Sequence, residues 1–286
     1  MQNILEIKNL NKTYPSFRLN DVNFSVPCGS IVGFIGENGA GKTTTIKLIL
    51  NEMKRDSGSV TVFGLDNIKD EREIKEQLGV VFDESYFHGE FKAGDINTIL
   101  KHVYQSWDSD LFSRYLDQFK LPKNKIIKEY SKGMKMKLGI ASALAHRPRL
   151  LILDEATSGL DPIVRSDILD IFLDFIQDET HSVLFSSHIT SDLEKVADYV
   201  TFIHEGQIVF DRSKDDLMNH CGILKCGASD FGKLDKSDLV RWRKNEFDYE
   251  ALVLDRDRVK RSYPDLVIDN ATIDEIMLMY VKGEKV

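Results

Sequence analysis

Residues 36–43 read GENGAGKT and match the phosphate-binding pattern G-x-x-x-x-G-K-[ST] at every fixed position. Residues 30–36 are almost continuously apolar, as in a strand covered on both faces, and residues 42–50 have the apolar spacing of an amphipathic helix. A strand, a glycine-rich turn and a helix in this order direct backbone N–H groups and the positive end of the helix at one anion. The sequence therefore predicts a phosphate site. The alternative is a glycine-rich loop that binds nothing.

Two side chains of this loop add chemistry to its backbone. The Lys42 ammonium is expected between the β- and γ-phosphates of a nucleotide, and the Thr43 hydroxyl is expected to coordinate Mg²⁺. The predicted nucleotide contacts along the loop are Gly36, Glu37, Asn38, Gly39, Ala40, Gly41, Lys42, Thr43 and Thr44.

A second acidic element follows about 110 residues after the loop, where the apolar run 150–153 ends in Asp154 and Glu155. At the carboxyl end of a buried strand, Asp154 is expected to face the Mg²⁺ shell. Glu155 points elsewhere and is expected to polarise the attacking water as a general base. The alternative for Glu155 is a solvated surface acid.

The rest of the chain indicates an α/β fold. Residues 4–10 and 19–26 alternate apolar and polar side chains, which predicts an antiparallel β portion at the N-terminus. Apolar strands then alternate with helices, which favours a mostly parallel central sheet. Between about 84 and 130 the spacing is helical and more charged, as in a helical insert. Strand and helix patterns continue after 212, which argues against a disordered tail.

Residues 130–134, which read YSKGM, give the first specific family resemblance. They precede a helix and the strand that ends in Asp154, and they resemble the ABC signature L-S-G-G-Q. The serine and the second glycine are kept as Ser131 and Gly133, while Tyr130, Lys132 and Met134 depart from the pattern. A hydroxyl and bare N–H groups at a helix N-terminus suit an anionic γ-phosphate. Without its neighbours, Ser131 would be interpreted as an ordinary helix N-cap.

Further motifs follow in the order typical of ABC ATPases, over about residues 3–211. Residues 158–161 resemble the D-loop, and the resemblance places Asp161 against a partner subunit. His188, after the next strand, resembles the switch histidine that contacts the γ-phosphate. Tyr14 resembles the aromatic residue that stacks on adenine, with a strand-end tyrosine as the alternative.

One position departs from the family in a way that changes charge. The family has a glutamine after the strand that corresponds to 78–82, and its amide touches Mg²⁺ and relays to the membrane partner. Here the position holds Asp83. A carboxylate is a hard oxygen ligand, so we predict that Asp83 replaces the glutamine at the metal. The alternative is a helix N-cap that faces away from the site.

The resemblance implies an ABC-type P-loop fold and an ATP-hydrolysing subunit of a bacterial exporter-type transporter. We expect an ATP-binding domain at 1–211 with a helical subdomain at about 84–145, and a small α/β accessory domain at 212–286. ATP is then held between the loop of one copy and the Ser131 helix of a second, identical or different, ATPase subunit. Residues 269–280 resemble, more weakly, the closing helix of exporter-type subunits.

The same resemblance implies a separate integral membrane permease, for which residues about 84–130 are the expected docking surface. No stretch approaches the roughly 20 apolar residues that span a bilayer, and three cysteines fit a reducing compartment. We therefore expect a cytoplasmic protein held at the cytosolic face of the membrane by its permease.

Other functions of ABC ATPases remain as alternatives. The net charge of −8 disfavours nucleic acid as a partner. Translation factors of this family usually carry two cassettes, and DNA-maintenance types insert long coiled coils before the signature. This chain has one cassette and no heptads between the phosphate loop and the signature. An ATP-dependent sensor is the third alternative, and the presence of Glu155 and His188 argues against it.

Overall fold

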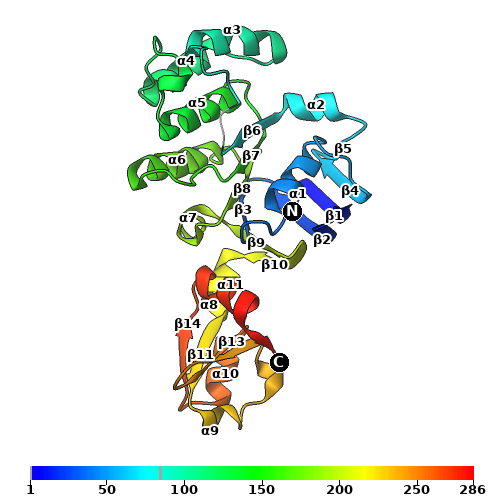
Figure 1. Ribbon diagram of the computed structural model, residues 1–286, viewed down its shortest axis with the longest axis vertical. Helices are drawn as coiled ribbons and strands as arrows, with labels where there is room; N and C mark the ends of the chain where they lie inside the picture. The colour runs from blue at the N-terminus through cyan, green and yellow to red at the C-terminus, as the bar shows by residue number, and fades with distance from the viewer. Residues whose placement is uncertain (1, 84–85) are drawn as a thin grey trace. The chain divides into compact units, whose positions relative to one another are not determined.

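The structure is a computed structural model that describes residues 2–83 and 86–286. The chain forms two compact units, one that ends at Phe210 and one that runs from Asp211 to Val286 (Figure 1). The sequence predicts its domain boundary between residues 211 and 212. Each unit has a sheet and a buried core of its own.

A six-stranded sheet with the order β10-β9-β3-β8-β7-β6 forms the centre of the first unit. β3 pairs in parallel with β8 and β9, and β7 pairs in parallel with β6 and β8. The carboxyl ends of parallel strands meet at one edge, so the segments that follow β3, β6, β7 and β8 come together there. The strands are β3 Ile31–Ile35, β6 Leu78–Phe82, β7 Leu150–Asp154, β8 Ser182–Ser187, β9 Tyr199–His204 and β10 Gln207–Ser213.

A second sheet of the first unit is the predicted antiparallel portion, with the order β2-β1-β4-β5. β1 pairs antiparallel with both β2 and β4. The sequence analysis does not predict β4, because its first residues are small, exposed and polar and only Val60 and Val62 are buried. Backbone hydrogen bonds to β1 stabilise this strand although its own side-chain pattern does not predict it. The strands are β1 Asn3–Thr13, β2 Arg18–Pro27, β4 Ser57–Val62 and β5 Leu65–Asp66.

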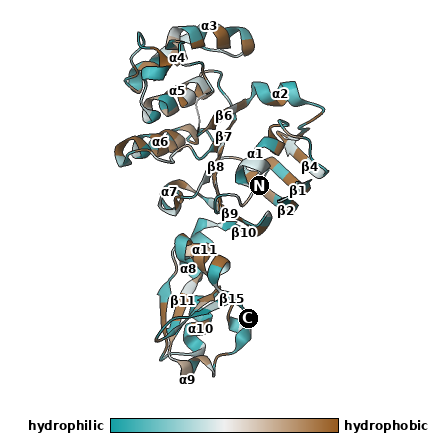
Figure 2. Cartoon of the chain, viewed as in Figure 1, coloured by the Kyte–Doolittle hydropathy of each residue, from teal (hydrophilic) through white to brown (hydrophobic). Residues whose placement is uncertain are grey.

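The helices of the first unit carry both apolar and polar bands, as amphipathic elements do (Figure 2). α3, α4 and α5 pack on one another and form the helical insert (Figure 1). Pro162 starts α6, where its missing N–H is harmless. The helices are α1 Lys42–Ile49, α2 Glu71–Glu76, α3 Ala93–Val103, α4 Ser109–Gln118, the 3₁₀ turn Ile127–Glu129, α5 Lys132–Leu144, α6 Pro162–Phe175 and α7 Thr190–Val196.

The second unit has an antiparallel sheet of order β14-β11-β13-β12-β15. Leu224, Ala251, Val253 and Val259 lie in its core. Its strands are β11 Gly222–Cys226, β12 Arg241–Lys244, β13 Tyr249–Val253, β14 Val267–Asn270 and β15 Glu284–Lys285. Its helices are α8 Lys214–His220, α9 Ala228–Phe231, the 3₁₀ turn Lys236–Asp238, α10 Arg256–Ser262 and α11 Ile273–Lys282. Over the described part of the chain, no helix is both long and apolar enough to cross a membrane.

The turn between β9 and β10 supports the phosphate loop through Gly206. Its N–H donates to the Ala40 carbonyl at 3.0 Å, and its φ is +75°. A Cβ at this position would lie 2.0 Å from the Arg18 carbonyl oxygen. Gly64 has a similar φ of +80°, but a Cβ there would meet nothing within 4 Å.

We expect Gly206→Ala to lower the free energy of unfolding by about 1–3 kcal/mol more than Gly64→Ala does. Both variants force alanine into the left-handed region, and only Gly206→Ala adds a clash with backbone. Denaturant unfolding in a Trp242→Phe background reports on the first unit alone, because Trp107 is then the sole tryptophan of the chain. Equal losses in the two variants would contradict the steric argument.

Candidate functional site

The phosphate loop joins β3 to α1 through backbone that only glycine adopts easily. Gly39 and Gly41 have φ values of +85° and +115°. A Cβ at Gly41 would also lie 2.9 Å from the Phe17 ring and 2.6 Å from Leu19, and a Cβ at Gly36 would lie 2.4 Å from the Ile203 carbonyl oxygen. The glycines of the pattern are therefore required by conformation and by close packing.

Lys42 is the buried cation of this loop, with 5% of its side chain exposed. Its Nζ donates to the Gly36 carbonyl at 2.7 Å and to the Glu37 carbonyl at 3.2 Å. The same Nζ lies 3.1 Å from Glu155 Oε1. The ammonium is thus held inside the loop by two carbonyl dipoles and one carboxylate, where an anionic phosphate oxygen would bind.

Asp154 ends β7 beside the start of α1. Thr43 Oγ1 donates to Asp154 Oδ2 at 2.7 Å, and Ser186 Oγ of the neighbouring strand donates to Asp154 Oδ1. Among the described residues, no three acidic, histidine or cysteine side chains form a metal cage. Mg²⁺ is typically held by one or two protein oxygens together with phosphate oxygens and waters, so the Thr43–Asp154 pair fits this ion.

Glu155 follows Asp154 with a φ of +54°, in the left-handed region that costs a residue with a Cβ free energy. Its N–H donates to both the carbonyl and the Oγ of Ser186 at 3.1 Å, which holds this backbone in place. Its carboxylate lies between two basic groups: Oε1 is 3.1 Å from Lys42 Nζ and Oε2 is 2.6 Å from His188 Nδ1. The unusual backbone thus aims the carboxylate into the loop.

A cavity of about 470 Å³ opens beside these groups. Phe17 is the aromatic residue that lines it, whereas Tyr14 donates its hydroxyl to Met53 Sδ at 3.1 Å and has the Lys12 ammonium 5.5 Å from its ring centre. The adenine contact of Tyr14 therefore stays a prediction. The cavity is lined by Ser16, Phe17, Glu37, Asn38, Gly39, Gly41, Lys42, Thr43, Thr44 and Glu155.

The signature residues lie on a different element from this cluster. Ser131 is the N-cap of α5 and accepts from the Met134 N–H at 3.2 Å, and a Cβ at Gly133 would lie 3.0 Å from Val164 of α6. Asp161 is the N-cap of α6. Within residues 2–83 and 86–286, no hydrogen bond joins the Ser131 side chain to the phosphate loop, Asp154 or Glu155. One chain thus supplies two separate sets of predicted contacts.

Asp83 forms an ion pair with Lys132, with 2.6 Å between Oδ1 and Nζ. The partner of Asp83 is thus a lysine, whereas the two other predicted metal ligands, Thr43 and Asp154, are hydrogen-bonded to each other. Its assignment to the metal stays a prediction.

Comparison with known proteins identifies the family. A family model described as ABC transporter matches residues 19–158. The bacitracin transport ATP-binding protein BcrA of Bacillus licheniformis is 32% identical over 269 residues, which cover 93% of this chain and 87% of that protein. The chain is an ATP-binding subunit of an ABC transporter. The lantibiotic transport ATP-binding protein SrtF of Streptococcus pyogenes is 34% identical over 224 residues, covering 76% of this ABC subunit and 93% of that protein.

A solved structure described as an ATP binding subunit of an ABC transporter has the same fold as this ABC subunit. It superposes with a TM-score of 0.67 at 27% identity and covers 76% of this chain and 92% of that one. The family and the α/β fold with a mostly parallel central sheet, both predicted from the sequence, are confirmed. This ABC subunit is therefore an ATPase that binds ATP.

Sequence reasoning missed two contributors to the site of this ABC ATPase. Ser186 orients Asp154 and anchors Glu155, and the signal was a pair of serines, Ser186 and Ser187, at the end of an otherwise apolar strand. Phe17 lines the cavity and packs against Gly41. It lies three residues after Tyr14, the residue to which the family resemblance assigns the adenine contact.

Proposed function

We propose that this subunit hydrolyses ATP with Glu155 as general base and drives a separate membrane permease. The observation that carries the chemistry is the Glu155 carboxylate held between Lys42 and His188, beside the Thr43–Asp154 oxygens. A general base must lie within hydrogen-bond reach of the proton it takes, and this carboxylate opens on the cavity of the loop. Loss of phosphate release in Glu155→Gln with ATP binding retained is the test.

The ion pair between Lys42 and Glu155 suggests the order of events. A γ-phosphate oxygen competes with the carboxylate for the Lys42 ammonium, because both are anions at one buried cation. Once Lys42 holds the phosphate, the Glu155 carboxylate is free to accept a proton from the attacking water. His188 keeps it oriented through Nδ1. Thr43 and Asp154 would hold Mg²⁺, which would supply positive charge for the phosphate oxygens.

A complete site needs a second ATPase subunit in this proposal. Ser131 and Gly133 present a helix N-terminus, and Asp161 begins the next helix, outside the hydrogen-bonded cluster around Lys42. Ile163, in the first turn of α6, is 75% exposed, and a second subunit placed against Asp161 would remove this apolar side chain from water. Two subunits placed head to tail about a two-fold axis then form two equal sites, each with one loop and one Ser131 helix.

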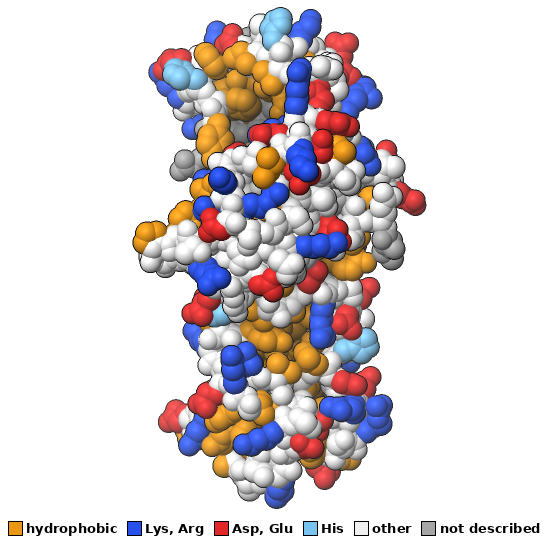
Figure 3. Space-filling view, turned by 90° about the vertical axis from the view of Figure 1, so that its right-hand side faces the viewer, with side chains coloured by type: hydrophobic (Ala, Val, Ile, Leu, Met, Phe, Trp, Pro, Cys, Tyr) orange, Lys and Arg blue, Asp and Glu red, His pale blue; other side chains and the backbone are white. Residues whose placement is uncertain are grey.

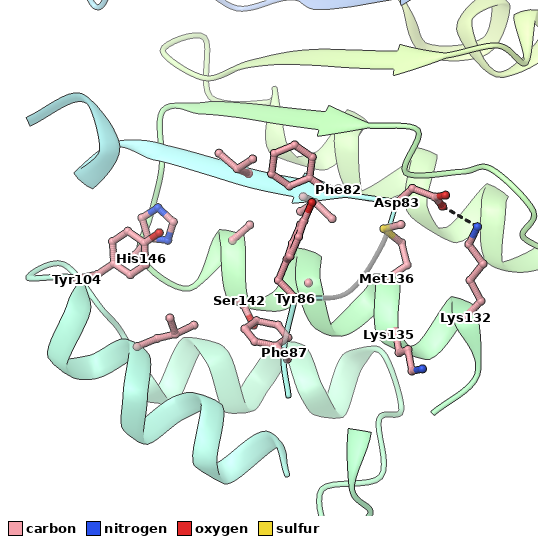
Figure 4. A pocket seen from close by; sticks show the side chains of 15 residues that line it. Phe82, Asp83, Tyr86, Phe87, Tyr104, Lys132, Lys135, Met136, Ser142 and His146 are labelled. Atoms are coloured by element: carbon pink, nitrogen blue, oxygen red, sulfur yellow. Dashed lines mark ion pairs between the residues drawn. The ribbon is translucent and has the colours of Figure 1, made fainter. Parts of the chain in front are cut away.

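The permease is proposed to dock at a cavity of about 260 Å³ between β6, α3 and α5. Hydrophobic side chains surround a hollow in the helical part of the first unit, and most of the cavity lining is apolar (Figures 3 and 4). Burial lowers the pKa of His146, so this residue of the lining is neutral at pH 7. Tyr86, at the mouth, is 73% exposed and packs edge-on against Phe82. Such a cavity suits an apolar cytosolic segment of a membrane protein.

The relatives named above are described as bacitracin and lantibiotic transport proteins. On that basis we propose that this subunit energises export, and that docking on the permease holds it at the cytosolic face of the membrane.

We expect Tyr86→Asp to weaken binding to the permease by about thirty-fold, because removing a buried aromatic anchor from an interface costs about 2 kcal/mol. The matched control is Ile68→Asp, which places the same charge at a large apolar residue that is 46% exposed and lies outside the cavity lining. The measurement is the amount of permease that co-purifies from membranes with each variant. Equal recovery with both variants would contradict this docking surface.

A further inference from the structure

Two residues that depart from the ABC pattern are partners of each other. Asp83 replaces an amide with a negative charge, and Lys132 replaces the first glycine of the signature with a positive one. The two positions are far apart in the chain, yet Lys132 Nζ lies 2.6 Å from Asp83 Oδ1 (Figure 4). The departures therefore compensate each other in charge.

Lys132 lies at the N-terminus of α5, where the sign of a charge affects the stability of the helix. It is the first residue of α5, directly after Ser131, and the first turn of α5 contains no acidic residue. A cation at a helix N-terminus opposes the helix dipole, so an unpaired Lys132 would destabilise this turn. A carboxylate close to Lys132 offsets this effect, because it pairs with the ammonium and is itself favoured at that end of the helix.

The ammonium also lies beside the turn that follows Glu155. A Cβ at Gly159 would be 3.3 Å from Lys132 Nζ, so the lysine head lies between the end of β6 and the turn of residues 158–161. The pair thus joins three segments of the site: the residue after β6, the N-terminus of α5 and the turn that leads to Asp161.

Folding stability does not account for this pair. The Lys132 and Asp83 side chains are 45% and 42% exposed, and ion pairs exposed to this degree contribute little to the free energy of folding. The pair links the helix end that carries Ser131 to the residue after β6 and to the turn at Gly159.

We propose that Asp83 is a positioning residue that acts through Lys132 to hold the N-terminus of α5 in place, so that Ser131 meets the nucleotide of the second subunit. This role rests on the proposed two-subunit site. It differs from the metal-ligand role predicted for Asp83 from the sequence, since here the carboxylate acts through a cation that is itself part of the signature.

The test is a double-mutant cycle in the Glu155→Gln background, with the dissociation constant of the ATP-dependent dimer as the readout. Asp83→Asn leaves the Lys132 cation unpaired and is expected to weaken pairing about tenfold, the size typical of coupled contacts. Lys132→Gln leaves the carboxylate unpaired and is expected to weaken pairing to a similar extent. The double variant removes both charges and is expected to pair within about threefold of the parent, less than the product of the single effects.

Lys135→Gln is the control for loss of a lysine from α5. Lys135 lines the proposed permease-docking cavity together with Asp83 and Lys132. The effects of Lys135→Gln and Asp83→Asn on the dimer dissociation constant should multiply, with no rescue in the double variant. The Mg²⁺ concentration for half-maximal ATP hydrolysis, measured for Asp83→Asn with Glu155 intact, separates the two roles of Asp83. A positioning role leaves it unchanged, whereas a rise would assign the carboxylate to the metal and overturn the proposal.

Two further outcomes separate a failure of the positioning role from a failure of the two-subunit site. If the parent pairs with ATP but the single effects multiply in the double variant, the positioning role is wrong and the two-subunit site stands. If the parent does not pair with ATP at all, the two-subunit site is wrong and the positioning role is wrong with it.

Discussion

Glu155→Gln is expected to lower the rate of ATP hydrolysis by about 10²- to 10⁴-fold, the usual contribution of a general base. Glutamine keeps the size and the hydrogen-bonding reach of the side chain but cannot accept the proton of the attacking water. ATP binding is expected to persist, because Lys42, Thr43 and Asp154 are unchanged. ATP binding should tighten modestly. In the parent the Glu155 carboxylate lies 3.1 Å from the Lys42 ammonium and competes with the phosphate for it, and the variant removes this competing anion.

Phosphate release under saturating ATP and Mg²⁺ measures the rate, and binding of a fluorescent ATP analogue measures the affinity. Glu73→Gln is the matched control, because it makes the same change on the exposed face of α2 and should hydrolyse ATP at the parent rate. A Glu155→Gln variant that keeps the parent rate would show that another group accepts the proton. A variant that loses ATP affinity would show that the carboxylate is needed to shape the loop.

The parts of the site that the sequence predicts are those that a local pattern specifies. The phosphate loop is one continuous segment, and Asp154 and Glu155 follow an apolar strand whose end is visible in the sequence. The helix after Ser131 and the strand 78–82 also follow from side-chain periodicity and agree closely with α5 and β6.

The missed parts depend on pairing between distant segments. Ser186 reaches Asp154 because the register of the parallel pair β7 and β8 sets these two residues side by side. β4 forms because its backbone pairs antiparallel with that of β1. The partner of Asp83 is set by the packing of α5 beside the end of β6. No property of these segments taken one at a time contains that information.

ATP is expected to convert Glu155→Gln from monomer to dimer, whereas Ser131→Arg in the same background is expected to stay monomeric, with pairing weakened by at least about a hundredfold. The γ-phosphate is the group that both subunits would hold, so ATP favours the closed pair and ADP, which lacks it, releases the pair. Blocked hydrolysis in Glu155→Gln lets the closed form accumulate. Arginine at position 131 fills the space that the phosphate needs at the N-terminus of α5 and breaks an interface that serves both sites at once.

Ser213→Arg is the control that separates pairing from folding. Ser131 and Ser213 are both helix N-caps that accept from a backbone N–H three residues later, at 3.2 and 3.1 Å. Each loses a cap worth about 1 kcal/mol when replaced, so the two variants carry similar folding penalties. Only Ser131→Arg should lose the ATP-dependent dimer in gel filtration with light scattering. Equal mass for Glu155→Gln in ATP and in ADP, at high protein concentration, would mean that the site does not require two chains.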